Sequence, residues 1–400
     1  MERGLPVLRD YLDHIGFVQL YKFMVTARCY HTNPNALSWW SLDRMADIES
    51  YVTSDSPALG LAACLMLKVS VPQAMLSPFE QRVAERLVDA GLVVRTHDNV
   101  RMGAYQLISA HDMPLLIDSR VNYPGAIAHQ VYFGSDSLHL LYYVDTSGIA
   151  ATDRVIDLGT GSGVIGLALA RYANHVTMTD VSPQALELAQ VNRLLNRVTG
   201  NVTIRDERCE ETLARPERYD VVTFNPPFMP LPDGLGAPVF ARGLGPDGLG
   251  YCRMLLDNLD HILLPGGTAY TVASLLGSSQ GPFFTEELRR YADRHGLRID
   301  VFIDTATPLT AGAPMFEALG AFLHGENAAI PRQECQRRVE ELLMQTLGAT
   351  HTYLSVLVIR AAQAAQAAQA TQATQDARSA VRVFHWTAGA PFPSPTSNPV

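Results

Sequence analysis

The residues best suited to chemistry are Asn225-Pro226-Pro227-Phe228, which directly follow a strand-like run over residues 219–224. The side-chain oxygen of Asn225 can accept one N–H of an amino or amide group, and the carbonyl of Pro226 can accept the other. The two prolines stiffen the turn, so both acceptors are preorganised. Phe228 offers a flat apolar face to a planar molecule. The pattern predicts that Asn225, Pro226 and Phe228 are catalytic residues acting on a planar nitrogen.

Such a site matches the needs of a conjugated NH2 group, which is a poor nucleophile because its lone pair is delocalised. Two acceptors on its protons direct electron density to nitrogen and orient it towards an electrophile, and positioning supplies much of the acceleration. No strong base is required, since the proton leaves once nitrogen has become cationic. The alternative is a Pro-Pro loop with only a structural role.

A second candidate site is the glycine-rich turn Gly159-Thr160-Gly161-Ser162-Gly163, which follows a strand-like run over 154–158 and precedes a helix expected from Val164. Glycine lets the backbone turn sharply and approach a ligand closely. The helix N-terminus adds free N–H groups and a positive dipole end. Open α/β sheets bind ligands beyond their strand ends. We therefore expect a cofactor at this turn.

Two cofactors fit the turn. Gly161-x-Gly163-x-x-Gly166 matches the dinucleotide fingerprint, and Asp180 stands where a ribose-binding acid belongs. Asp157 separates the two, because a carboxylate before the glycines repels a pyrophosphate but attracts the ammonium and sulfonium of S-adenosylmethionine. We therefore expect S-adenosylmethionine, with NAD as the alternative. The structural alternative for Asp157 is a turn-capping aspartate.

The elements around these turns alternate between strands and helices. This order is typical of an α/β, Rossmann-like fold with a mainly parallel sheet, here of seven strands. Helical residues 315–347 form an insertion at about 305–350. The expected strands are 154–158, 175–179, 202–205, 219–224, 267–273, 297–303 and 352–359, and the expected helices are 164–172, 183–196, 249–264 and 283–295.

Residues 1–120 are expected to form a helical, winged-helix-like domain. Helices are predicted over 5–28 and 58–68, and a third begins at Ser77-Pro78, with Ser77 as N-cap, and ends at Gly91. Strands 92–95 and 100–108 follow. Such units often bind DNA, but this third helix carries mixed charge, which disfavours phosphate contacts. A non-catalytic binding module built on this domain is one alternative function.

Composition further restricts the kinds of partner, site and location that are expected for this protein. The 400 residues carry a net charge of −9, which disfavours a nucleic-acid partner. The five cysteines form no CxxC pair, so neither a metal site nor a disulfide framework is expected. No apolar run is long enough to span a membrane, and the charged N-terminus lacks a signal sequence, so we expect a cytoplasmic protein.

The rest of the chain is expected to divide into three parts. Residues 121–153 are interpreted as a connector and 154–360 as the catalytic domain. Residues 361–400, rich in Ala and Gln and then in Pro, are interpreted as a flexible tail.

The two motifs together resemble the class I methyltransferases of the "small domain" group, which includes release-factor glutamine N-methyltransferases and RNA base N-methyltransferases. The resemblance rests on Asp157–Gly163 and Asn225–Phe228, and it extends to the Gly-Pro-Asp-Gly segment at 245–248 and the turn at 264–267. It covers about residues 132–360. It implies S-adenosylmethionine as cofactor and N-methylation as the reaction.

The resemblance also implies roles for individual residues. Phe133 lies in a stretch that, by the resemblance, closes over cofactor and acceptor, and it would be part of the cofactor site. The other residues that the resemblance places in this site are Asp157, Gly159, Thr160, Gly161, Gly163, Asp180, Val181, Asp206, Glu207 and Asn225. Asp180 would hold the ribose, and Asp206 or Glu207 would lie near the adenine. The chain departs from the family at Arg208, where an acid is expected, and at Phe228, where the glutamine enzymes usually carry tyrosine.

The leading hypothesis is an N-methyltransferase acting on a small molecule or a protein side chain. The apolar, glycine-rich loop over 229–236 fits such acceptors. The acidic balance argues mildly against RNA, so an RNA base N-methyltransferase is the alternative. An NAD-dependent oxidoreductase is the alternative from another class, but it leaves Asn225–Phe228 unexplained.

Overall fold

A computed structural model of the chain describes residues 2–22, 60–67, 70–118, 131–198, 200–238, 240–362 and 380–385. These residues fall into two compact units. The first comprises Met1–Leu138, Gly161–Ala168 and Ser182–Ile204, and the second comprises His139–Thr160, Leu169–Val181 and Arg205–Val400. Among the described helices, none is both long and apolar enough to cross a membrane.

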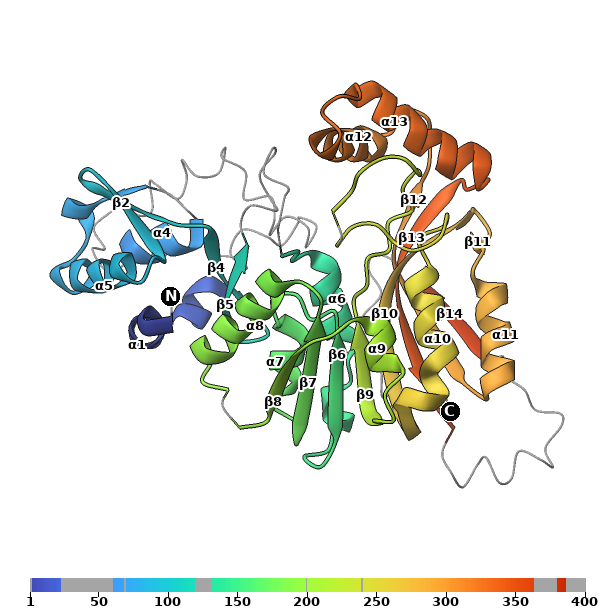
Figure 1. Ribbon diagram of the computed structural model, residues 1–400, viewed down its shortest axis with the longest axis horizontal. Helices are drawn as coiled ribbons and strands as arrows, with labels where there is room; N and C mark the ends of the chain where they lie inside the picture. Colours follow the sequence, from blue (N-terminus) through green and yellow to red (C-terminus); the bar gives the residue numbers. More distant parts are fainter. Residues whose placement is uncertain are drawn as a thin grey trace. The chain divides into compact units, whose positions relative to one another are not determined.

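The N-terminal part of the first unit combines three helices with a small sheet (Figure 1). The sheet has the order β1-β3-β2. Glu80 is buried and accepts hydrogen bonds from Tyr11 Oη (2.9 Å) and the Leu61 N–H (3.1 Å), which ties the three helices together. The elements are η1 (Glu2–Gly4), α1 (Leu5–His14), α4 (Gly60–Leu67), β1 (Val71–Pro72), η4 (Gln73–Met75), α5 (Pro78–Asp89), β2 (Val93–Thr96) and β3 (Asn99–Met102).

This order agrees with the predicted winged-helix-like arrangement, and two details differ. The helix predicted over 5–28 is interrupted after His14, where Gly16 adopts a left-handed φ of 60°. The strand predicted over 100–108 is divided at Gly103 into β3 and β4 (Tyr105–Ala110), and β4 pairs with an unpredicted strand, β5 (Met113–Asp118). Parts of the predicted elements lie outside the described residues: 23–28 of the first predicted helix, 58–59 and 68 of the second, and 121–130 of the predicted connector.

The central sheet confirms the predicted α/β class. Its order is β14-β12-β13-β10-β9-β6-β7-β8, with β11 on β10, so the described residues form a sheet of nine strands rather than the predicted seven. Strands β6, β7, β9 and β10 pair in parallel, whereas β13 is antiparallel to β10 and β12. The strands are β6 (Arg154–Leu158), β7 (His175–Asp180), β8 (Val202–Asp206), β9 (Tyr219–Phe224), β10 (Leu263–Ser278), β11 (Gly281–Pro282), β12 (Arg298–Pro308), β13 (His351–Arg360) and β14 (Val381–His385).

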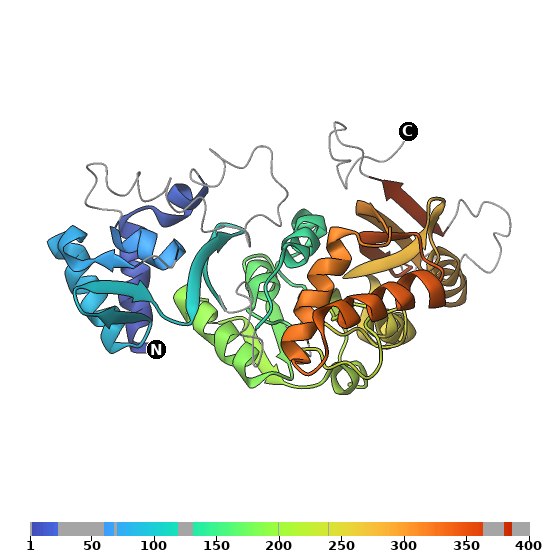
Figure 2. The same cartoon turned by 90° about the horizontal axis from the view of Figure 1, so that it is seen from above.

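Helices connect most of these strands. In α10 the residues Cys252, Leu255, Leu256 and Leu259 recur every three or four positions, and they are buried in one cluster with strand residues such as Val222. The helices are α6 (Ser135–Tyr143), η6 (Thr146–Gly148), α7 (Val164–Leu169), α8 (Pro183–Leu195), α9 (Cys209–Leu213), α10 (Gly250–Ile262), α11 (Thr285–His295), α12 (Pro314–Glu326), α13 (Arg332–Glu340) and the π-helix η7 (Glu341–Thr346). In Figure 2, α12 and α13 lie side by side.

Strand β14 lies within the segment expected to be a flexible tail. It pairs in parallel with β12, and its Arg382 donates two hydrogen bonds to the buried Asp300 (2.6 and 2.7 Å). Arg360 of β13 donates a third (2.6 Å). Burial alone would raise the pKa of Asp300, but the hydrogen bonds from both arginines outweigh it and the pKa is lowered. A tail without structure is therefore the wrong description for 381–385, while 363–379 and 386–400 lie outside the described residues.

Candidate functional site

The two motifs lie at the same edge of the sheet. Strand β6 lies between β7 and β9 and is parallel to both. Leu158, the last residue of β6, is in register with Phe224, the last residue of β9. Gly159 and Asn225 therefore begin their turns side by side, beyond the carboxyl ends of neighbouring parallel strands, where open α/β sheets bind ligands.

The glycine turn has a backbone that only glycine adopts easily. Gly159, Gly161 and Gly163 have φ values of 61°, 56° and 82°. A Cβ on Gly159 would meet only the edge of the Phe224 ring, at 3.7 Å, so conformation rather than crowding requires glycine there. The Thr160 N–H donates to the Thr179 carbonyl (2.8 Å) and fastens the turn to β7. The turn is thus preorganised, which agrees with a role in close backbone approach to a ligand.

Asp157 is buried beneath this turn. One of its oxygens accepts a hydrogen bond from Thr160 Oγ1 (2.6 Å) and the other accepts one from Thr223 Oγ1 (2.8 Å). The carboxylate therefore links the glycine turn to β9, as a turn-capping aspartate would. Its predicted contact with a cationic cofactor stays a prediction, and these two threonines fix the carboxylate beside the turn.

Asp206 and Glu207, at the carboxyl end of β8, differ in their exposure to solvent. Asp206 is exposed, whereas Glu207 is only 6% exposed, and its N–H donates to the carbonyl of Asp180 at the end of β7 (3.1 Å). Glu207 Oε1 pairs with Arg215, while Oε2 is buried without a hydrogen-bond partner among the described residues. A buried carboxylate oxygen in this state calls for a donor. Glu207 is therefore the better candidate for the adenine amino group.

Val181 adds an apolar surface at the same edge. It directly follows Asp180 and leaves 44% of its surface exposed, although it is a large aliphatic residue. A planar ring resting on it would remove this surface from water. The roles of Val181 and Glu207 towards a nucleoside cofactor stay predictions.

The turn Asn225–Phe228, called the acceptor turn below, is followed by backbone that contacts the glycine-rich segment over residues 241–248. The Met229 N–H donates to the Ala241 carbonyl and the Gly243 N–H donates to the Met229 carbonyl, both at 3.0 Å. Gly248 has a φ of 77°. A Cβ there would lie 2.9 Å from the nitrogen of Pro230 and 3.0 Å from the carbonyl carbon of Phe228. The Gly-Pro-Asp-Gly segment is thus packed against the backbone of the acceptor turn.

Two arginines that sequence reasoning missed hold this segment in place. Arg242 donates to the carbonyls of Leu231 (3.0 Å), Pro232 (3.1 Å) and Leu235 (2.5 Å). Arg253 forms two hydrogen bonds with Asp247 (2.9 and 2.6 Å), which lower the pKa of Asp247 although burial alone would raise it. The signal in the sequence for Arg242 was its place at the start of the Gly-rich stretch, and Arg253 had none because its partner Asp247 lies six residues before it, outside its own helix.

Phe133, another predicted cofactor residue, belongs to the first unit. Phe133 is half-buried in the stretch before α6, where Tyr132 Oη donates to Asp136 Oδ1 (2.8 Å). A Cβ on Gly161 would meet the Tyr132 carbonyl at 3.6 Å, so this stretch passes close to Gly161, and the role of Phe133 towards a cofactor stays a prediction. Burial, followed by the nearby Asp136 charge, raises the pKa of Tyr132 well above its ordinary value.

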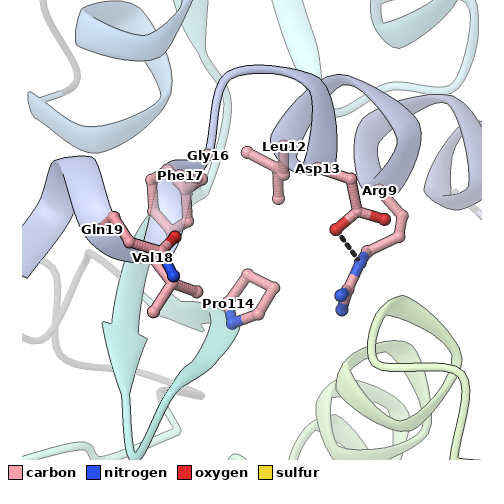
Figure 3. A pocket seen from close by; sticks show the side chains of 8 residues that line it. All are labelled: Arg9, Leu12, Asp13, Gly16, Phe17, Val18, Gln19 and Pro114. Carbon is pink, nitrogen blue, oxygen red and sulfur yellow. Dashed lines mark hydrogen bonds and ion pairs between the residues drawn. The ribbon is translucent and has the colours of Figure 1, made fainter.

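Other parts of the molecule offer less. The first unit has a pocket between α1 and β5, lined by Arg9, Leu12, Asp13, Phe17 and Pro114 among others (Figure 3). Its charged side chains, Arg9 and Asp13, pair with each other (2.9 Å), so the pocket presents no excess charge to a ligand. Within the described ranges, no three His, Cys, Asp or Glu side chains gather as a metal site would require.

Comparison with known proteins finds relatives of part of the chain. Residues 128–232 match the methyltransferase small domain family model. The chain is 34% identical over 133 residues to a release factor glutamine methyltransferase of Clostridium acetobutylicum, covering 30% of this chain and 47% of that protein. It is 38% identical over 136 residues to the enzyme of the same name from Moorella thermoacetica, covering 32% and 47%.

A third relative has a different name. The chain is 29% identical over 178 residues to an uncharacterized RNA methyltransferase of Staphylococcus aureus, covering 40% of this chain and 39% of that protein. The chain thus spans about half the length of the glutamine methyltransferases it matches. The segment over residues 128–232, which matches the methyltransferase small domain family model, contains both the glycine turn and the Asn-Pro-Pro-Phe turn.

Proposed function

We propose that this chain is an S-adenosylmethionine-dependent N-methyltransferase that acts on a planar nitrogen of a small molecule or a protein side chain. The observation that carries the proposal is the register pairing of Leu158 with Phe224, which sets the glycine turn and the acceptor turn side by side. A methyl donor and a nitrogen acceptor must meet within bonding reach, and adjacent parallel strand ends supply that proximity.

The residues at this edge suit S-adenosylmethionine better than NAD. Gly159, Gly161 and Gly163 would hold its methionine part, Asp180 the ribose hydroxyls, and Val181 and Glu207 the adenine. The buried carboxylate of Asp157 lies at the turn, where NAD would bring an anionic pyrophosphate. The cofactor supplies a methyl group on a positively charged sulfur.

The chain's own part in the reaction is to present the acceptor. Asn225 Oδ1 and the Pro226 carbonyl accept the two N–H groups of an amide or conjugated amine and so orient its nitrogen. Pro226 is buried and its ring fixes the backbone angle φ, which limits the movement of its carbonyl. Phe228 is half-buried and offers a flat surface to the planar group.

The charges near the acceptor loop favour a protein or small-molecule acceptor over RNA. Phosphate binding requires arginine or lysine side chains with free donors. The guanidinium of Arg242 is already engaged with three carbonyls. The arginines of α13 are paired with glutamates of the insertion: Arg332 with Glu317, and both Arg337 and Arg338 with Glu334.

Two measurements test this proposal with the full chain. Calorimetry with S-adenosylmethionine and with NAD tests the cofactor, and binding of NAD alone would overturn the methyltransferase assignment. Incubation with deuterium-methyl S-adenosylmethionine then tests the acceptor, using a purified bacterial release factor, total RNA and a small-molecule extract as separate pools. Mass spectrometry should find the label in the protein or small-molecule pool. Label confined to RNA would make the RNA alternative correct.

A further inference from the structure

The insertion between β12 and β13 contributes most of one hydrophobic cluster. Helices α12, α13 and η7 bury Phe316, Leu323, Cys335, Val339 and Leu343 in this cluster, which also includes Leu276 near the end of β10. Figure 1 shows this helical pair beyond the ends of β12 and β13. The helices therefore do not help to build the sheet, and their position calls for another role.

Part of that cluster comes from the loop that follows the acceptor turn. Leu231 and Leu235 are 4% and 5% exposed, and both belong to the same buried cluster as the insertion helices. The loop over 229–237 contains no helix or regular strand, only an isolated bridge from Met229 to Arg242. Its conformation must therefore come from contacts with other elements, and the insertion provides the apolar ones.

A pair of hydrogen bonds fixes the end of this loop. Asn327 Oδ1 accepts from the Gly236 N–H (2.8 Å), and Asn327 Nδ2 donates to the Gly236 carbonyl (2.9 Å). Asn327 Nδ2 also donates to the Leu323 carbonyl in the last turn of α12 (2.8 Å), so the amide is itself held by the helix it follows. Only a side-chain amide offers both a donor and an acceptor in this geometry.

The loop is thus held on two sides. Arg242 binds three of its carbonyls from the glycine-rich segment, and Asn327 binds Gly236 from the insertion. We propose that the insertion positions the acceptor, with Asn327 as a positioning residue that holds the loop leading out of Asn225–Phe228. This inference rests on the proposed function. The insertion lies outside the segment that matches the family model, and in this proposal it holds the acceptor side of the site in place.

Hydrogen exchange on the full chain tests the structural half of this proposal. In Asn327→Ala, peptides covering 229–237 should exchange about tenfold faster, as expected for loss of two ordinary hydrogen bonds, whereas peptides covering α10 should not change. Glu317→Ala is the matched control, because it removes an exposed ion pair within the same insertion (3.2 Å to Arg332) and touches neither Asn327 nor the loop. An unchanged loop in Asn327→Ala would overturn the proposal.

Methyl transfer tests the functional half, with a purified bacterial release factor and a small-molecule extract as probes. Asn327→Ala should lower transfer about tenfold while its affinity for S-adenosylmethionine, measured by calorimetry, stays at the wild-type value and reports a folded protein. Asn327→Asp keeps an acceptor for the Gly236 N–H but sets a carboxylate oxygen against the carbonyls of Gly236 and Leu323, so it should not recover the loss. Faster exchange with wild-type transfer would overturn the positioning role. Absence of transfer by the wild type would instead contradict the proposed function, and the exchange result would still decide whether Asn327 holds the loop.

Discussion

Substitution of one glycine behind the acceptor turn should uncouple methyl transfer from cofactor binding. Gly248→Ala introduces a Cβ that would lie 2.9 Å from the nitrogen of Pro230 and 3.0 Å from the carbonyl carbon of Phe228, and closer still to the Phe228 oxygen. Because ordinary contact begins at 3.4 Å, the Phe228 backbone must retreat by on the order of 1 Å. A shift of that size in a positioned reacting group costs about 100-fold in rate.

The same segment contains a matched control. Gly245 has the same φ as Gly248, 77°, but a Cβ there would find only Asp247 Oδ1, at 3.6 Å. Gly245→Ala therefore carries the left-handed backbone penalty of roughly 1–2 kcal/mol without the clash. Thermal unfolding of both variants separates the two effects, because the backbone penalty should lower the stability of both proteins.

The assay compares initial rates of methyl transfer with calorimetric affinity for S-adenosylmethionine. Gly248→Ala should lose about 100-fold in rate and keep its affinity within about twofold, whereas Gly245→Ala should keep both. Equal rates in the two variants would refute the claim that Gly248 sets the position of the acceptor turn. Loss of cofactor affinity in Gly248→Ala would show that this segment supports the cofactor site instead.

Three further predictions concern other parts of the site and the sheet. Asn225→Ala should reduce methyl transfer about 100-fold, because an acceptor for the substrate N–H is lost, with cofactor affinity nearly intact by calorimetry; equal loss of both would mean that the acceptor site is misplaced. Glu207→Gln should weaken S-adenosylmethionine binding about tenfold, since a charged acceptor is replaced, whereas Asp206→Asn, at an exposed neighbour, should bind as the wild type does; equal effects would contradict the choice of Glu207. Asp300, whose pKa is lowered in the folded chain, contributes stability that is present above its unfolded pKa of about 3.9 and is lost as the pH falls through the lower folded value; urea unfolding should show that Asp300→Asn removes this dependence, and an unaltered pH profile would contradict it.

The sequence predicted the strands that carry the site well, because their signals are local. Strands β6 and β9 have the predicted bounds, since each is an apolar run ended by glycine or proline. Strand β10 is longer than the expected 267–273, because a register shift between Leu263 and Thr268 absorbs the turn residues Pro265 and Gly266. Strand β14 was missed because its Val-Arg-Val-Phe-His run is short and lies between an Ala/Gln repeat and a Pro-rich end, which together were interpreted as a flexible tail.

The arrangement of side chains within the site needed the structure. The positions of the glycine turn and the acceptor turn follow from their strands, but the partners of Asp157 do not, because Thr223 lies 66 residues away in sequence. Asp206 and Glu207 are adjacent acids, and the structure distinguishes them because Glu207 is buried and its N–H binds the end of β7, whereas Asp206 is exposed. The contact between Asn327 and Gly236 spans 91 residues and leaves no pattern in the sequence.

The most direct test of the central claim is a crystal structure of the full chain with S-adenosylhomocysteine, the product that S-adenosylmethionine leaves behind. The account predicts that its homocysteine part lies on the turn Gly159–Gly163, its adenine lies beside Val181 and Glu207, and its sulfur faces Asn225. A nucleoside bound elsewhere, or a sulfur directed away from the Asn-Pro-Pro-Phe turn, would contradict it.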